Sequence, residues 1–363
     1  MDEQRHGRVF PLGHGADCSR CYPQPPAWLW PGLVSLEDVS RLQVVSGKGG
    51  TGKTTVAAAL ALALATEGKR TLLVEVEGRQ GIAQLFETEA LPYEERKIAV
   101  APGGGEVYAL AIDPEQALLD YLQMFYKLGG AGRALRKLGA IDFATTIAPG
   151  LRDVLLTGKA CEAVRRKDKS GAFLYDHVVM DAPPTGRITR FLNVNDEMAG
   201  LAKIGPIHNQ AQAVMRVLKS PETAVHLVTL LEEMPVQETA DGIAELRAAG
   251  LPVGEIIVNM VRPEVLDAAD LELARTVPHA DVARALSAAG LGGARRGGNA
   301  ERLVDPLLHQ AAEYAERYAL EQEQRAVLAE LGLPMRELPL FAEGMDLAGL
   351  YELATELRKQ GLS

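Results

Sequence analysis

Short apolar runs alternate with longer helical patterns along most of this chain. Continuous apolar runs are typical of strands that are buried on both faces of a parallel sheet. We expect strands at 42–46, 71–76, 107–112, 177–180, 225–231, 255–259 and 336–341. Helical periodicity predicts helices at 53–66, 114–168, 196–219, 236–249 and 347–359, and further helices up to about 331 with a break at 290–299. This order predicts an α/β fold, a doubly wound, mostly parallel sheet with helical insertions.

A glycine-rich loop separates the first expected strand from the first helix. Its residues are Gly47, Lys48, Gly49, Gly50, Thr51, Gly52, Lys53, Thr54 and Thr55, and they fit the phosphate-binding pattern G-x-x-x-x-G-K-[ST]. Glycines let successive backbone N–H groups point at an anion, and the following helix adds its dipole. Lys53 would reach the β- and γ-phosphates of a nucleotide, and the Thr54 hydroxyl would hold Mg²⁺. The alternative is a glycine-rich turn that binds nothing.

A second polar segment follows the strand at 177–180. Asp181 ends this strand, and ligands of open α/β sheets bind at the carboxyl ends of strands. An acid at this position can hold Mg²⁺ through water, as in phosphate-loop NTPases. Gly186 can place its backbone N–H near a γ-phosphate and release it after hydrolysis. The alternative is a turn with an exposed aspartate.

Composition and charge narrow the class of protein. Of 363 residues, 47% are hydrophobic and 24% are charged, which is ordinary for a globular protein with a large core. The net charge of −10 argues against nucleic acid as the main partner. No apolar run reaches the length of a membrane span, so we expect no stable membrane insertion. Without a signal-peptide core or a disulfide framework, the chain fits a cytoplasmic protein.

The first 40 residues differ from the rest in composition. They contain several prolines and no sustained periodicity, so we expect either a mostly disordered N-terminal extension or an upstream start, ahead of a phosphate-loop domain at 41–363. Within the extension, Cys18 and Cys21 form a C-x-x-C pair, and no second pair completes a zinc site. A metal at this pair and a pair without a ligand both stay open.

The two nucleotide motifs together resemble a known family. The loop at 47–55, with its additional Lys48, resembles the deviant phosphate loop of the MinD/ParA and ArsA group. The segment 181–192 is similar to the D-x-x-P-T-G-x-x-x-R-F-L switch of the arsenite-pump and tail-anchored-protein-targeting ATPases, and 233–239, 256–259 and 338–340 occur in that family's order. The resemblance covers about residues 41–360 and is greatest to the paired ArsA-like ATPases of actinobacteria.

This resemblance implies an ATPase that binds ATP and Mg²⁺, and it implies roles for further residues. Lys48 would cross a dimer interface to the phosphates of the opposite subunit, which requires a homodimer or a heterodimer with a paralogous ATPase. A solvated lysine at a loop tip is the alternative. Asn259, Pro339 and Phe341 would line the adenine site, although Asn259 could merely end a strand.

One departure from the family concerns the acid that orients the attacking water. The family's first switch reads D-P-A-H, and the register here places Glu77 at the position of that aspartate. The longer side chain favours slow or conditional hydrolysis, because catalysis tolerates small displacements poorly. Glu75 is a second candidate acid, for which a structural role is the better interpretation. Arg79 either offers a cation to phosphate or is a solvated loop arginine.

Two further departures concern metals. The zinc-binding C-x-x-C of the targeting ATPases is absent from the helical segment 303–331, so metal cannot clasp a dimer there. The thiols of the arsenite pump are absent too, since Cys161 stands alone, and a soft metalloid needs several thiolates.

The helical segments 114–168 and 196–219 lie where the targeting ATPases build a groove for a hydrophobic protein client. Methionine suits adaptable binding surfaces, but ordinary core packing is the better interpretation of these apolar positions. The candidate groove residues are Met124, Phe125, Leu128, Met198, Leu201 and Met215.

Two functions of different classes follow. The first is a cytoplasmic, dimeric, Mg²⁺-dependent ATPase whose nucleotide state controls the binding of a protein client, with Lys48, Lys53, Glu77 and Asp181 in catalysis. The second is a hydrolytically weak regulatory subunit that binds nucleotide and scaffolds a paralogous ATPase, which Glu77 favours. A partition ATPase of the ParA type fits less well, because the chain is acidic and shows no basic patch for DNA.

Overall fold

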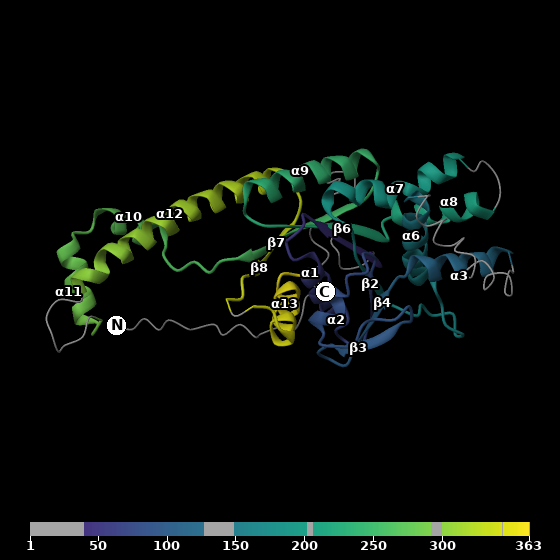
Figure 1. Ribbon diagram of the computed structural model, residues 1–363, viewed down its shortest axis with the longest axis horizontal. Coiled ribbons are helices and arrows are strands. Elements are labelled where there is room, and N and C mark those ends of the chain that lie inside the picture. Colours follow the sequence, from purple (N-terminus) through teal and green to yellow (C-terminus); the bar gives the residue numbers. More distant parts are fainter. Residues whose placement is uncertain (1–39, 127–148, 202–205, 292–299, 343, 363) are drawn as a thin grey trace, which may run out of the picture. The chain divides into compact units, whose positions relative to one another are not determined.

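The computed structural model describes residues 40–126, 149–201, 206–291, 300–342 and 344–362 (Figure 1). The expected extension, with Cys18 and Cys21, lies outside these residues apart from Ser40. The described residues contain an eight-stranded sheet with the order β3-β4-β2-β5-β1-β6-β7-β8. The strands are β1 (Leu42–Gly47), β2 (Arg70–Glu75), β3 (Arg96–Val100), β4 (Glu106–Ala111), β5 (His177–Asp181), β6 (Thr223–Thr229), β7 (Val253–Val261) and β8 (Met335–Pro339).

The sheet confirms the predicted α/β class. Every strand pair is parallel except β3 with β4. Each strand expected from an apolar run is present, but β3 was not predicted. It is an antiparallel edge strand with exposed Arg96, Lys97 and Val100, so its sequence has no continuous apolar run.

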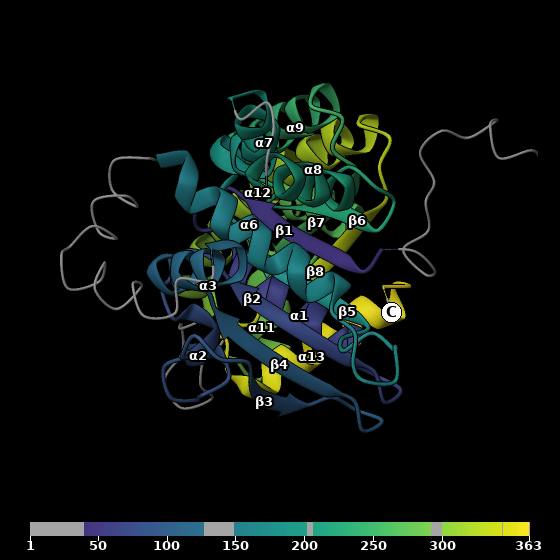
Figure 2. The ribbon, with the colours of Figure 1, turned by 90° about the vertical axis from the view of Figure 1, so that its right-hand side faces the viewer.

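Helices cover both faces of the sheet (Figure 2). One face carries α1 (Lys53–Leu64), α2 (Gly81–Leu85) and α13 (Leu347–Lys359). The other carries α3 (Pro114–Tyr126), α6 (Pro149–Arg165), α7 (Thr185–Leu201), α8 (Pro206–Leu218) and α9 (Glu233–Ala248). The helix α12 (Ala300–Glu330) contacts α9 and also α10 (Ala268–Thr276) and α11 (His279–Ala288). None of these helices is long and apolar enough to cross a membrane.

The helix α1 is buried on nearly all sides. The residues from Val56 to Leu64 are alanine, leucine and one valine, and they have little or no exposed surface. The helix lies between the sheet and α13. A helix that is apolar all round belongs in a core, and its small side chains permit close packing. The strand β1 is also fully buried. The glycine-rich loop is therefore held between two rigid elements.

One helical prediction needs correction. Helical structure after β5 begins at Thr185 and not near Asp196, because Thr185 and Gly186 form the first turn of α7. Of the candidate groove residues, Met215 on α8 is buried in the core, which agrees with the preferred interpretation of ordinary core packing. The side chains of Met124, Phe125, Met198 and Leu201 are outside the described part of the chain, as is Leu128.

Candidate nucleotide site

The phosphate-binding loop depends on glycine at particular positions. Gly50 and Gly52 have φ angles of 91° and 82°, in the left-handed region that other residues rarely adopt. A Cβ on Gly47 would lie 2.2 Å from the carbonyl oxygen of Val228, so β1 and β6 approach too closely for a side chain. No side chain caps the N-terminus of α1 at Gly52. Its first N–H groups are thus available to an anion.

Asn259, at the end of β7, contacts this loop directly. Its side-chain amide donates a hydrogen bond to the carbonyl of Thr51 at 2.9 Å, and a Cβ on Gly52 would lie 2.4 Å from the same amide nitrogen. Asn259 therefore does more than end a strand. The other two residues expected at the adenine site are Pro339 and Phe341. Pro339 ends β8 and is exposed, whereas Phe341 follows β8 and is half-buried against the α1–α13 core.

Thr54 and Asp181 meet across the site. The Thr54 hydroxyl donates to Oδ2 of Asp181 at 2.7 Å, although the two residues come from different motifs. Asp181 is 8% exposed, and its Oδ1 has no hydrogen-bond partner within the described residues. Burial raises the pKa of this carboxyl to about 6, against the opposing effects of Thr54 and Lys53. A buried carboxylate with an unpaired oxygen is well suited to receive a cation or water.

The two lysines of the loop differ in their surroundings. Lys53 is 9% exposed at the start of α1. Lys48 is partly exposed, and its ammonium lies 2.8 Å from the Glu238 carboxylate on α9. The family resemblance included the segment 233–239, but no pattern in the sequence assigned a role to Glu238.

The acids after β2 have different roles in the structure. The Glu75 carboxylate accepts hydrogen bonds from the N–H groups of Gln80 and Ile82, at 2.5 and 3.3 Å, and so fixes the start of α2. This is the structural role expected for Glu75. Glu77 is instead 3.6 Å from the guanidinium of Arg79, whose side chain is 74% exposed. Arg79 is thus a solvated loop arginine that pairs with the candidate catalytic acid.

The switch segment after β5 is tied to the strand that precedes the phosphate loop. The hydroxyl of Ser46 donates to the carbonyl of Pro183 at 2.6 Å, a contact that no pattern along the sequence predicted. A Cβ on Gly186 would meet nothing within 4 Å, so the side-chain position of this glycine borders open space. The buried hydroxyl of Thr185 has no partner within the described residues.

A small cavity of about 140 Å³ lies beside both switch segments. The residues around it come from the segment after β2, from α6 and from the start of α7. Arg187 lies 4.0 Å from Asp153 on α6, and burial raises the pKa of Asp153 while the nearby arginines oppose the shift. The lining residues are Val76, Glu77, Arg79, Arg152, Asp153, Leu156, Pro183, Arg187 and Phe191.

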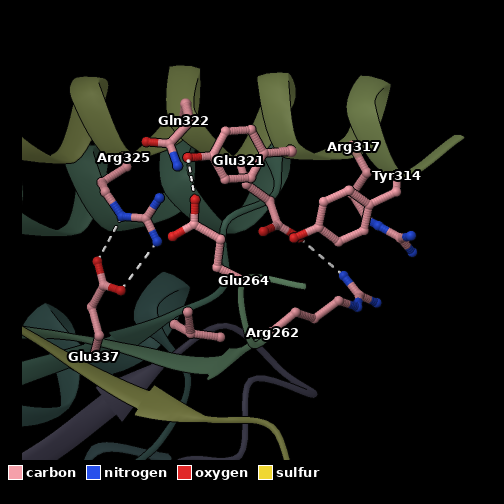
Figure 3. Close-up of a pocket in the computed structure, with 10 residues that line it drawn as sticks. Arg262, Glu264, Tyr314, Arg317, Glu321, Gln322, Arg325 and Glu337 are labelled. Carbon is pink, nitrogen blue, oxygen red and sulfur yellow. Dashed lines mark hydrogen bonds and ion pairs between the residues drawn. The ribbon is translucent and has the colours of Figure 1, made fainter. Parts of the chain in front are cut away.

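A larger cavity, of about 310 Å³, lies between α12 and the ends of β7 and β8 (Figure 3). Two of its arginines are paired with glutamates across these elements. Arg325 makes two hydrogen bonds to Glu337, at 2.6 and 3.1 Å, and Arg262 lies 3.1 Å from Glu321. These pairs fasten α12 to the sheet. The lining residues are Val261, Arg262, Glu264, Tyr314, Arg317, Tyr318, Glu321, Gln322, Arg325 and Glu337.

The described residues contain no group of three or more His, Cys, Asp or Glu side chains that could hold a metal ion by themselves. Cys161 is fully buried, and burial raises the pKa of its thiol to about 12. A thiol in this state is a poor nucleophile and a poor metal ligand.

The site geometry agrees with comparisons to known proteins. The model of the ArsA family, described as anion-transporting ATPases, matches residues 40–221, which include the loop, Glu77, Asp181 and Gly186. The chain belongs to this family of ATPases. This confirms the family and the ATPase activity that the sequence motifs predicted.

Relatives of this ATPase match it along most of its length. It is 52% identical to ATPase BagA of Mycobacterium tuberculosis over 339 residues. These aligned residues cover 92% of this chain and 96% of that protein. It is 27% identical over 335 residues to an arsenical pump-driving ATPase of Acidiphilium multivorum, covering 87% of this chain and 54% of the relative. It is also 27% identical over 250 residues to ATPase GET3 of Eremothecium gossypii, covering 60% and 70%.

Proposed function

We propose that this ATPase is an Mg²⁺-dependent dimeric switch of the cytoplasm that hydrolyses ATP and couples its nucleotide state to a protein client. One contact carries the proposal, the 2.7 Å hydrogen bond between Thr54 and Asp181. It joins the phosphate loop to the switch segment at the uncapped N-terminus of α1. Lys53 and the loop N–H groups would bind the phosphates of ATP there.

The residues present fit Mg²⁺. The ion prefers oxygen ligands and keeps several waters. Thr54 offers a hydroxyl, and Asp181 offers a buried carboxylate oxygen with no partner within the described residues. Thr54 would hold Mg²⁺ directly and Asp181 would hold it through water. The ion would neutralise charge on the phosphate oxygens.

The remaining ligand contacts follow from the strand ends. Asn259, already bound to the loop carbonyl of Thr51, would turn toward the adenine edge or support the loop beneath it. Pro339 and Phe341 would flank the adenine ring. Gly186 would offer its N–H to the terminal phosphate from the open first turn of α7.

The coupling to a client is supported by the cavity beside the switches. Glu77, Pro183 and Asp153 line the same space, so the two switch segments and α6 meet there. A change at either switch would alter the Arg187–Asp153 contact and move α6 relative to the sheet. The helices α3, α6, α7 and α8 pack on one another, and a hydrophobic client would bind to this helical region.

The hydrolytically weak regulatory subunit remains the second candidate, and one observation favours it. Glu77 is paired with Arg79 and is one methylene longer than the aspartate of the family pattern. A carboxylate that is paired with a neighbouring cation is less free to orient the attacking water. In that case a paralogous ATPase would complete the dimer.

The test is to measure phosphate release and mass in solution for the purified chain with Mg²⁺ and either ATP or ADP. We expect turnover and a dimer with ATP, and a loss of turnover of at least about a hundredfold in Lys53→Ala. Lys97→Ala, on the exposed edge strand β3, is the matched control and should behave as the wild type. Full turnover in Lys53→Ala would contradict the proposal. ATP binding by a monomer without turnover would favour the regulatory subunit, and unchanged turnover of the assembled complex in Glu77→Gln would remove Glu77 from the mechanism.

A further inference from the structure

Lys48 has a partner within its own subunit. The Lys48–Glu238 pair, at 2.8 Å, is partly buried, with 28% and 37% of the two side-chain surfaces exposed. The backbone of Lys48 is also held, because its carbonyl accepts hydrogen bonds from the N–H and the hydroxyl of Thr51, at 3.3 and 2.9 Å. The pair therefore joins a fixed point of the loop to α9.

Glu238 is held in place by its neighbours on α9. Val236 and Thr239 are buried, and the hydroxyl of Thr239 donates to the carbonyl of Pro235 at 2.8 Å. One turn further along, a Cβ on Gly242 would lie 3.0 Å from a methyl carbon of Thr185, so α9 packs closely on the start of α7. Glu238 thus reaches the loop from a helix that also contacts the switch segment.

We propose that Glu238 is a positioning residue, which holds Lys48 until a phosphate group takes the place of its carboxylate. Carboxylate and phosphate oxygens compete for the same ammonium group, and the loop that carries Lys48 has the pattern of a phosphate site. The loop next to Lys48 borders open space, because a Cβ on Gly49 or Gly50 would meet nothing within 4 Å.

The source of the phosphate rests on the proposed function, in which Lys48 contacts the nucleotide of the opposite subunit. Breaking the Lys48–Glu238 pair then opposes association, so Glu238 sets the subunit concentration at which the ATP-bound dimer forms. The nucleotide of the same subunit is the other source of phosphate. In that case the pair opposes ATP binding by separate subunits.

The experiment compares wild type, Glu238→Gln and Glu233→Gln. Glu233 is an exposed acid in the first turn of the same helix, so its variant has the same change of charge. ATP affinity with Mg²⁺ is measured at dilutions where subunits are separate, and association is measured by sedimentation at saturating ATP. We expect Glu238→Gln to tighten association by about three- to tenfold. This is the effect of removing two partly exposed ion pairs, one in each subunit of the dimer. Glu233→Gln should change neither the ATP affinity nor the association.

Two further readouts separate this role from a structural one. The difference between wild type and Glu238→Gln should disappear at about 1 M salt, because salt screens the ion pair. Glu238→Asp, which keeps the charge, should restore part of the wild-type association. Lys48→Ala removes the ammonium group. In this background, the additional change Glu238→Gln should have no further effect on association.

Each outcome decides between the claims. Equal or weaker association of Glu238→Gln, together with an unchanged ATP affinity of the separate subunits, overturns the role of Glu238 while the ATP-dependent dimer of the wild type stands. Tighter ATP binding by separate subunits with unchanged association supports the exchange at Lys48 and contradicts the proposed contact with the opposite subunit. An absence of ATP-dependent dimers in all three proteins contradicts the proposed function and, with it, this role of Glu238.

Discussion

Two buried polar clusters lie on the same sheet and differ in how their atoms are paired. At the carboxyl ends of the strands, Oδ1 of Asp181 and the hydroxyl of Thr185 have no partners within the described residues. On β6 and β7, both ring nitrogens of His226 are bonded, to Gln43 at 2.6 Å and to the N–H of Glu255 at 3.1 Å. The Glu255 carboxylate is in turn paired with Arg336 at 2.7 and 2.9 Å.

The difference separates a candidate ligand site from structural support. Buried polar groups are usually hydrogen-bonded, and those left unpaired need an explanation. The unpaired atoms lie beside a loop whose glycines leave open space, whereas the His226 cluster is closed. The cavity beneath α12 is larger than the one beside the switches, but its ion pairs are internal, so it belongs with the structural group.

Among single changes in these two clusters, Asp181→Asn should reduce turnover most. The variant keeps the shape of the side chain and can still accept the hydrogen bond of Thr54, but it removes the charge that would hold Mg²⁺. We expect turnover to fall about 10- to 100-fold. The free energy of unfolding should stay the same or rise, because burial disfavours the charged carboxyl. A destabilised variant with normal turnover per folded molecule would place Asp181 in the structural group.

The His226 cluster should show its role in stability at acidic pH. Burial lowers the pKa of His226 to about 4, from an ordinary value of 6.5. The unfolded chain therefore binds the proton more tightly, and stability falls as pH drops from about 6.5 toward 4. From the two pKa values we expect a loss of about 2 kcal/mol between pH 7 and pH 5.

Urea unfolding at the two pH values measures this loss, and His226→Gln is the control. The variant lacks the titrating ring, so the difference in its pH dependence from that of the wild type isolates the contribution of His226. Turnover at pH 7 should be unchanged in the variant per folded molecule. Equal pH dependence in the two proteins would mean that His226 is not held neutral by burial.

The smallest effect is expected beneath α12. Glu337→Gln weakens the ion pair with Arg325. The side chains of Arg325 and Glu337 are 25% and 34% exposed, so the variant should lose less than about 1 kcal/mol of unfolding free energy. Turnover should not change. A tenfold loss of turnover in this variant, seen in the same phosphate-release assay, would show that the cavity beneath α12 acts on the nucleotide site.

The sequence predicted most of the fold because its signals are local. Apolar runs located the parallel strands from β1 to β7, and the loop pattern located the junction of β1 and α1. The edge strand β3 was missed, because an edge strand is exposed on one side and has no continuous apolar run. The start of α7 was missed because the proline and glycine residues around Thr185 are typical of a turn.

The candidate site was predicted only as far as its motifs extend. Thr54 and Asp181 were named separately, and their hydrogen bond shows that the two motifs lie side by side in the fold. The contacts of Glu238, Ser46 and Asp153 join residues that are far apart in sequence, and no pattern along the chain pairs them. Such contacts depend on how helices pack on the sheet, which local periodicity does not specify.

The assignment of the nucleotide site is best tested by calorimetric titration of the purified wild-type chain with ATP, in the presence and absence of Mg²⁺. Binding does not depend on turnover, so the result holds for a self-sufficient ATPase and for a regulatory subunit. We expect one ATP per chain, bound more tightly with Mg²⁺, and a loss of the Mg²⁺ effect in Asp181→Asn. Equal affinity with and without Mg²⁺, or no binding to the wild type, would contradict the assignment of the unpaired carboxyl edge as the nucleotide site.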